Sequence, residues 1–235
     1  MCTVTFVPKG NKDFIVTSNR DEAPMRHTLA PQLYEIDAVT VLFPKDSIAG
    51  GTWIGVSGAR RMVCLLNGGF TAHERKDNYR MSRGIIVKDL LVASEGRSAM
   101  QHYDYTNIEP FTIIMVDWKR DLQLVELVWD GEQAHIAEKP LAPHIWSSSL
   151  LYSEEVKRKR EQWFSQFLLK DVTPSEATLL QFHKTAGDGN KESDVIMDRG
   201  FVKTKSITQI VKERALKMRY EDLQTGKIAA HSLAL

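Results

Sequence analysis

The alternation of hydrophobic and polar positions predicts two strands at the start of the chain. Residues 2–7 alternate and are rich in β-branched side chains, and residues 14–17 repeat the pattern after a polar turn at 8–13. If the two segments pair as a hairpin, Cys2 lies opposite the neighbourhood of residues 18–20. The chain start and a charged segment are then spatial neighbours, so the open end of this hairpin is the first candidate location for a catalytic site.

Further along the chain, the same patterns predict a mixture of strands and helices. Strands are expected at 39–43, 53–56, 61–66, 111–116 and 122–129. Helices are expected at 82–103 and from Ser153 onward, and a capping box at 173–176, with Pro174 at the first helical position, opens another. The basic run 157–160 is interpreted as the solvated face of its helix rather than a phosphate site.

Composition narrows the possible functions. A chain of 235 residues with 43% hydrophobic content is enough for one core, so we expect one domain over residues 1–235. The 31 basic and 30 acidic residues balance, so no nucleic-acid partner is expected. Charges at Lys9, Lys12 and Asp13 argue against a signal peptide, and no run reaches the roughly 18 apolar residues of a membrane span. These features predict a cytoplasmic location.

Cys2 is a candidate N-terminal nucleophile if Met1 is removed. The new α-amino group, with a pKa of about 7.7–8.0, can then accept the proton of the thiol, whose pKa is about 8.5. Arg20 is the candidate cation that favours the thiolate, and Asp21 the candidate that orients the amine. The alternative is that Cys2 is a small hydrophobic residue and that 19–22 is a charged strand end.

Three positions in the first third of the chain have both a chemical and a structural interpretation. Asn67 is a candidate oxyanion donor, although Asn-Gly is also the commonest hairpin turn. The pair Gly50 and Gly51 permits close approach of a ligand or of another backbone, and a turn or bulge is the favoured interpretation. Trp53 is expected in the core or in a pocket wall.

Five ordered sequence blocks resemble the NRDE family, also called the transport and Golgi organisation family. The blocks are Cys2, Asn19-Arg20-Asp21-Glu22, Gly50-Gly51-Thr52-Trp53-Ile54-Gly55, Leu66-Asn67 and Ser82-Arg83-Gly84. The family is similar to N-terminal nucleophile hydrolases of the choloylglycine hydrolase and penicillin V acylase group. That resemblance implies an α+β fold, a four-layer αββα sandwich of two antiparallel sheets flanked by helices.

The resemblance also implies substrate-binding positions, with two departures. Asn19, Trp53, Ser148 and Lys205 are the expected substrate-binding residues. The related acylases carry an asparagine where this chain has Ser148, and an arginine where it has Lys205. Serine reaches less far than asparagine, and lysine lacks the planar fork that binds a carboxylate in two places. Substrates of those acylases therefore do not transfer to this chain.

The sequence leaves two functions open. One is a cysteine amidohydrolase that acts on a linear C–N amide through Cys2, Arg20, Asp21 and Asn67. The other is a non-catalytic carrier or chaperone for haem or another hydrophobic ligand, because the resembled family is associated with haem handling. No cofactor is expected, and the scattered histidines predict no metal site. The expected partner is a small-molecule amide or a hydrophobic ligand, and no oligomeric state is predicted.

Overall fold

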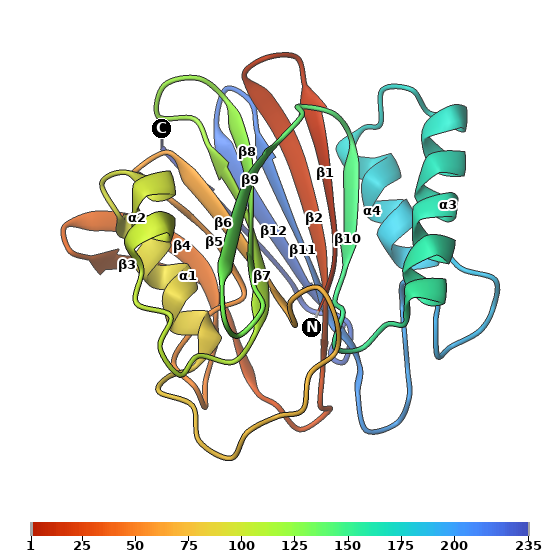
Figure 1. Cartoon of the computed structure of the whole chain (residues 1–235). Helices are drawn as coiled ribbons and strands as arrows, with labels where there is room; N and C mark the ends of the chain where they lie inside the picture. Colours follow the sequence, from red (N-terminus) through yellow and green to blue (C-terminus); the bar gives the residue numbers. More distant parts are fainter. Residues whose placement is uncertain (1, 235) are drawn as a thin grey trace. The chain divides into compact units, whose positions relative to one another are not determined.

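The computed structural model describes residues 2–234, which form two compact units (Figure 1). The first unit takes the chain up to Met25 together with Ala142–Ser232, and the second takes Arg26–Leu141 with the last residues from Leu233. Each unit contains one sheet and two helices. Within the described residues, no helix is both long and apolar enough to cross a membrane.

The first unit is built on a six-stranded sheet in which the two chain segments interleave. Its strands, in spatial order, are β10 (His144–Ser147), β1 (Cys2–Lys9), β2 (Asp13–Glu22), β11 (Lys203–Lys212), β12 (Leu216–Asp222) and β13 (Ile228–Leu233). The predicted hairpin is confirmed, because β1 and β2 pair antiparallel with Cys2 opposite Arg20. On its other side β2 pairs with β11, so β2 is a central strand.

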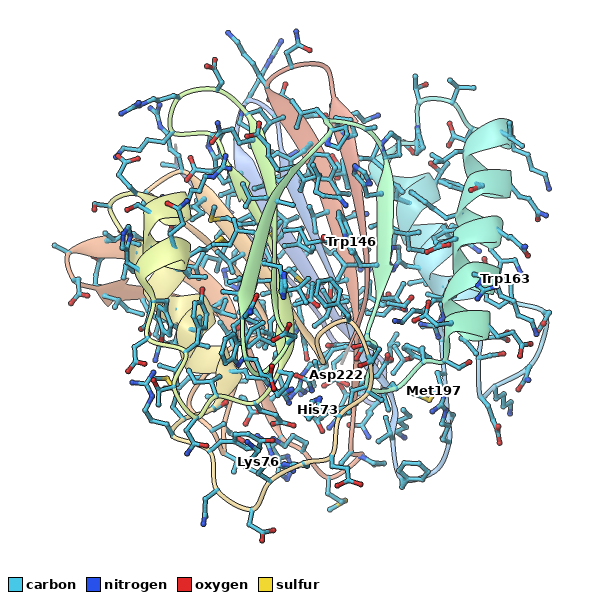
Figure 2. The ribbon with its side chains drawn as sticks, in the orientation of Figure 1. His73, Lys76, Trp146, Trp163, Met197 and Asp222 are labelled. Carbon is cyan, nitrogen blue, oxygen red and sulfur yellow. The ribbon has the colours of Figure 1, made fainter. Side chains whose placement is uncertain are left out.

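Two helices, α3 (Glu154–Lys170) and α4 (Glu176–Thr185), cover one face of this sheet (Figure 1). Alternate strand residues meet them, because side chains two apart in a strand share a face. The resulting apolar cluster consists of Val7, Ile15, Phe164, Leu179, Phe182 and Val211, with Trp163 of α3 packed against it (Figure 2). The two helices therefore bury the face that carries Val7 and Ile15.

The second unit is a seven-stranded meander. Its strands, in spatial and chain order, are β3 (Thr28–Ile36), β4 (Val39–Asp46), β5 (Ile54–Ser57), β6 (Arg61–Asn67), β7 (Phe111–Asp117), β8 (Gln123–Trp129) and β9 (Ala134–Lys139). Helices α1 (Arg83–Val92) and α2 (Gly96–His102) connect β6 to β7 and pack on the sheet. Ile86, Leu90 and Leu91 of α1 join the main apolar cluster of this unit.

Of the three helix predictions, the one from Ser153 onward is confirmed, because Ser153 is the N-cap of α3. The other two need correction. The segment 82–103 forms two helices, α1 and α2, instead of one. The buried guanidinium of Arg61 explains the break. Its Nη1 donates to the carbonyls of Leu90 (2.8 Å) and Ala93 (2.7 Å) and thereby caps the end of α1. The capping box predicted at 173–176 is shifted by two residues. Ser175 is the N-cap, and it exchanges hydrogen bonds with Thr178.

In the glycine pair before β5, Gly50 has the turn role that the sequence favoured, and Gly51 has the other role, close approach of another backbone. Gly50 has a φ of +68°, a conformation that glycine adopts without steric cost. A Cβ on Gly51 would lie 2.6 Å from the carbonyl carbon of Gly84 at the start of α1. The neighbouring backbone is held there by a hydrogen bond from Thr52 N to Gly84 O at 3.1 Å. Gly51 therefore permits α1 to approach the chain that leads into β5.

We predict that Gly51→Ala lowers the free energy of unfolding by about 1–3 kcal/mol, because the new methyl group meets backbone that must shift. Urea unfolding measures this difference. Gly58→Ala is the matched control, since a Cβ there has an ordinary 3.6 Å contact with Thr40 O. Equal effects of the two substitutions would contradict the close-packing account.

Candidate functional site

The Asn19-Arg20-Asp21-Glu22 run forms the end of β2, and its side chains alternate between the two faces of the sheet. Asn19 and Asp21 continue the spacing of Ile15, so they lie on the face that α3 and α4 cover, and both are fully buried. Arg20 lies on the opposite face, where its Nη2 is 3.5 Å from Glu22 Oε2. The motif therefore contributes to two different environments.

The chain start lies beside this motif. Cys2 pairs through its backbone with Arg20, and Asp21 follows Arg20 directly along β2. Met1 and the side chain of Cys2 lie outside the residues that the structure describes. The structural support for the predicted roles of Cys2, Arg20 and Asp21 therefore comes from this backbone register and from the contacts of Asp21.

Asp21 is held by two hydroxyl groups from distant parts of the chain. Tyr152 Oη donates to Asp21 Oδ2 at 2.5 Å, and Thr204 Oγ1 donates to Asp21 Oδ1 at 2.6 Å. Thr204 Oγ1 in turn accepts a hydrogen bond from the backbone N–H of Met197, whose side chain is labelled in Figure 2. Burial raises the pKa of Asp21, while the positive charge of Arg160 and the two hydroxyl donors act in the opposite direction.

Arg160 is the cation of this buried region. Its guanidinium carbon lies 3.7 Å from the centre of the Tyr152 ring, a cation–π contact. It donates to the carbonyls of Ser193 (3.0 and 3.1 Å) and Asp194 (2.6 Å), and to the hydroxyl of Thr3. The prediction that the run 157–160 is a solvated face is wrong for Arg160, which is fully buried.

Asn19 belongs to a second buried chain of hydrogen bonds. His183 Nδ1 donates to Asn19 Oδ1 at 2.6 Å, because the amide nitrogen of Asn19 donates to the carbonyls of His183 (2.9 Å) and Val195 (3.0 Å). His183 Nε2 then accepts from Thr5 Oγ1 at 2.8 Å. The order hydroxyl, imidazole and amide resembles a nucleophilic triad, but all three side chains are fully buried. The chain ties α4 to β1 and β2.

Ser148 and Lys205 lie in the first unit near the same strands. The buried Ser148 accepts the backbone N–H of Tyr152 at 3.1 Å through its carbonyl, so it shapes the turn that presents Tyr152. Lys205 sits at a bulge in β11 opposite Asp21 and Arg20. Its Nζ donates to Pro24 O at 2.8 Å, and burial, followed by the nearby Arg20, lowers the pKa of its ammonium group.

Asn67 and Trp53 lie in the second unit. Asn67 ends β6, and the chain continues through α1 and α2 before β7, so the hairpin-turn alternative for Asn67–Gly68 is wrong. Gly68 has a φ of +93° and its N–H donates to Pro110 O at 3.0 Å. Trp53 is a buried core residue whose carbonyl accepts from Leu65 N. The structure thus places one group of predicted site residues in the first unit, namely Asn19, Arg20, Asp21, Ser148 and Lys205. It places Asn67 and Trp53 in the second unit.

Sequence reasoning missed the residues that surround Asp21 and Asn19. These residues are Tyr152, Arg160, His183 and Thr204, and they are far from β2 in sequence. The one available signal was proximity to the expected substrate-binding residues, because Thr204 directly precedes Lys205 and Tyr152 follows Ser148 by four positions. Across residues 2–234, no group of three or more His, Cys, Asp or Glu side chains is arranged to hold a metal ion.

We predict that His183 makes stability fall with acidification. Burial, with a contribution from Arg160, lowers the pKa of His183 from 6.5 to about 3. The unfolded chain therefore binds a proton that the folded chain does not, so stability is complete above pH 6.5 and is lost as the pH falls towards 3, by up to about 5 kcal/mol. Urea unfolding at several pH values measures this loss.

The control for this pH dependence is a second histidine. His183→Gln should flatten the dependence between pH 6.5 and 3, whereas the exposed His102→Gln should leave it unchanged. An unaltered profile in His183→Gln would show that the folded protein accommodates a protonated imidazole at this position.

Comparison with solved structures shows a shared fold at low sequence identity. A C2A mutant of conjugated bile acid hydrolase from Clostridium perfringens is 8% identical, with a TM-score of 0.63, over 99% of this chain and 92% of that one. Penicillin V acylase from Agrobacterium tumefaciens is 9% identical, with a TM-score of 0.61, over 99% and 86% of the two chains. A Caenorhabditis elegans ortholog of N-acylethanolamine-hydrolyzing acid amidase is 12% identical, with a TM-score of 0.54, over 89% and 92%.

These likenesses confirm the predicted α+β fold class of two antiparallel sheets with helices, which this chain shares with those three proteins. No curated protein matches the chain in sequence. The sequence profile of the family described as Transport and Golgi organisation 2 matches residues 1–219, a stretch that runs through both units. The chain therefore belongs to the Transport and Golgi organisation 2 family.

Proposed function

We propose that the protein is a cysteine N-terminal nucleophile hydrolase that cleaves a linear C–N amide bond, with Cys2 as nucleophile after removal of Met1. The observation that carries the proposal is the β1–β2 register, which pairs Cys2 with Arg20 and puts Asp21 one residue beyond that pair. The fold shared with penicillin V acylase and with the ortholog of N-acylethanolamine-hydrolyzing acid amidase supports it. The proposed substrate is a small-molecule amide.

The proposed reaction uses the two functional groups of one residue. The α-amine of Cys2 takes the thiol proton, the sulfur attacks the amide carbonyl, and the amine then protonates the departing nitrogen. Water hydrolyses the resulting thioester and releases the acid. Arg20 favours the thiolate, Asp21 orients the amine, and Asn67 donates to the oxyanion that forms in each step.

We predict that Cys2→Ala abolishes hydrolysis of any N-acyl amide that the purified protein cleaves, because both the sulfur and its activation are lost. A panel of N-acyl amides with different acyl chains, followed by chromatography of the released amine, measures the activity. Cys64→Ala is the control, since Cys64 is a buried core thiol. Full hydrolysis by Cys2→Ala would reject the mechanism.

We further predict that Asn67→Ala lowers kcat by about 100- to 1,000-fold with little change in KM, the usual effect of losing one oxyanion donor. Steady-state kinetics on the substrate found in that panel measure the two constants. The exposed Asn11→Ala should change neither. A rise in KM with unchanged kcat would instead assign Asn67 to substrate binding.

A carrier or chaperone for haem or another hydrophobic ligand is the second candidate. The observation that favours it concerns Lys205, which stands where the related acylases have a substrate-binding arginine. Its Nζ donates to Pro24 O, so this ammonium group serves the chain's own structure, as a pocket that has lost the acylase substrate contact would allow. Titration with haem tests it. A Soret shift at one equivalent that is lost in a Cys2 or histidine variant supports the carrier, and no shift at one equivalent rejects haem. His183 is a poor axial ligand, because both of its ring nitrogens are hydrogen-bonded.

A further inference from the structure

We propose that Tyr152 is the positioning residue for Asp21 and that it works together with Arg160, as one buried chain of contacts from Arg160 through Tyr152 to Asp21. This inference rests on the proposed function, because it assigns the group that fixes the carboxylate beside the N-terminal amine. Tyr152 acts through Asp21 and takes no part in the bond-making steps.

The first support is that both oxygens of the Asp21 carboxylate accept a short hydrogen bond. Tyr152 holds Oδ2 at 2.5 Å and Thr204 holds Oδ1 at 2.6 Å, so the carboxylate has one orientation. Each carboxylate oxygen has two acceptor positions, so the group keeps capacity for a further donor. Asp21 lies one residue beyond the partner of Cys2, at the end of the hairpin where the amine is expected.

The second support is the charge on the far side of the tyrosine. The fully buried guanidinium of Arg160 is stacked at 3.7 Å on the Tyr152 ring, while it donates hydrogen bonds to neutral acceptors, the carbonyls of Ser193 and Asp194 and the hydroxyl of Thr3. A cation over the ring face withdraws electron density and makes the phenol a stronger donor. Arg160 therefore supports the ionised form of Asp21 both directly, through space, and through the Tyr152 hydroxyl.

The competing explanation is that Tyr152 only fills space. It packs with Met197 and Val202 in a small apolar cluster. Tyr152→Phe separates the two roles, because phenylalanine keeps the ring, the apolar packing and the stack with Arg160 and removes only the hydroxyl. Tyr105→Phe is the matched control, since Tyr105 Oη also donates one buried hydrogen bond, at 2.6 Å, to Met100 O in the second unit.

The first experiment follows the Asp21 carboxyl directly by NMR of the full chain labelled with ¹³C at aspartate Cγ. The Asp21 signal is assigned by its absence in Asp21→Asn. Loss of a hydroxyl that donates to the charged form should raise the titration midpoint of Asp21 by about one pH unit in Tyr152→Phe. Thr204→Val should shift it in the same direction, and Thr204→Ser, which keeps the hydroxyl, should not.

An unchanged Asp21 signal in Tyr152→Phe would overturn the inference. So would a shift of the same size in Tyr105→Phe, because the effect would then not depend on contact with Asp21. A wild-type Asp21 that is protonated at neutral pH would overturn it as well. None of these results depends on whether the protein hydrolyses an amide.

The second experiment is a double-mutant cycle on the rate at which iodoacetamide modifies Cys2, followed by peptide mass spectrometry. Asp21→Asn should slow the reaction roughly tenfold or more, and Tyr152→Phe should slow it severalfold. In the Asp21→Asn background, Tyr152→Phe should have no further effect. Additive effects would overturn the inference and leave the proposed function standing, whereas equal rates in wild type and Asp21→Asn would reject the role of Asp21 in the proposed function.

Discussion

A fully buried guanidinium, that of Arg160, is the constraint around which the first unit is organised. Removing a cation from water costs several kcal/mol, and the surrounding groups must offset that cost. Here they do so from four segments: Thr3 on β1, the carbonyls at 193 and 194, the face of the Tyr152 ring, and the charge of Asp21. The same charge contributes to the lowered pKa of His183, which is therefore neutral at physiological pH.

Polar residues line the face of β1 and β2 that α3 and α4 cover, and Arg160 donates to one of them, Thr3, and acts through its charge on another, Asp21. Thr3 and Thr5 on β1 and Thr17, Asn19 and Asp21 on β2 are all buried on the face that α3 and α4 cover. In the other half of that face, Val7 and Ile15 pack against Phe164 and Phe182. One helical layer therefore rests on an apolar half and on a hydrogen-bonded half, and the polar half is the one next to the chain start.

Local sequence was sufficient for the hairpin, and it placed Cys2 opposite residues 18–20, a window that includes its actual partner Arg20. The resemblance supplied the αββα class, which alternation alone does not distinguish from other sheet folds. The partners of Asp21 and Asn19 were not predictable, because Tyr152, His183 and Thr204 are 131 to 183 residues away in sequence. Two further features escaped prediction for the same reason, a contact between residues far apart in sequence. The burial of Arg160 involves Thr3, and the break between α1 and α2 involves Arg61.

We propose above that Cys2 is an activated N-terminal nucleophile. The measurement that tests this is mass spectrometry of the purified protein after brief exposure to one equivalent of a thiol-reactive electrophile at neutral pH. If Cys2 is such a nucleophile, Met1 is absent and Cys2 is modified well before Cys64, whose side chain is buried. Retention of Met1, or modification of Cys2 no faster than that of an unstructured cysteine peptide, would contradict it.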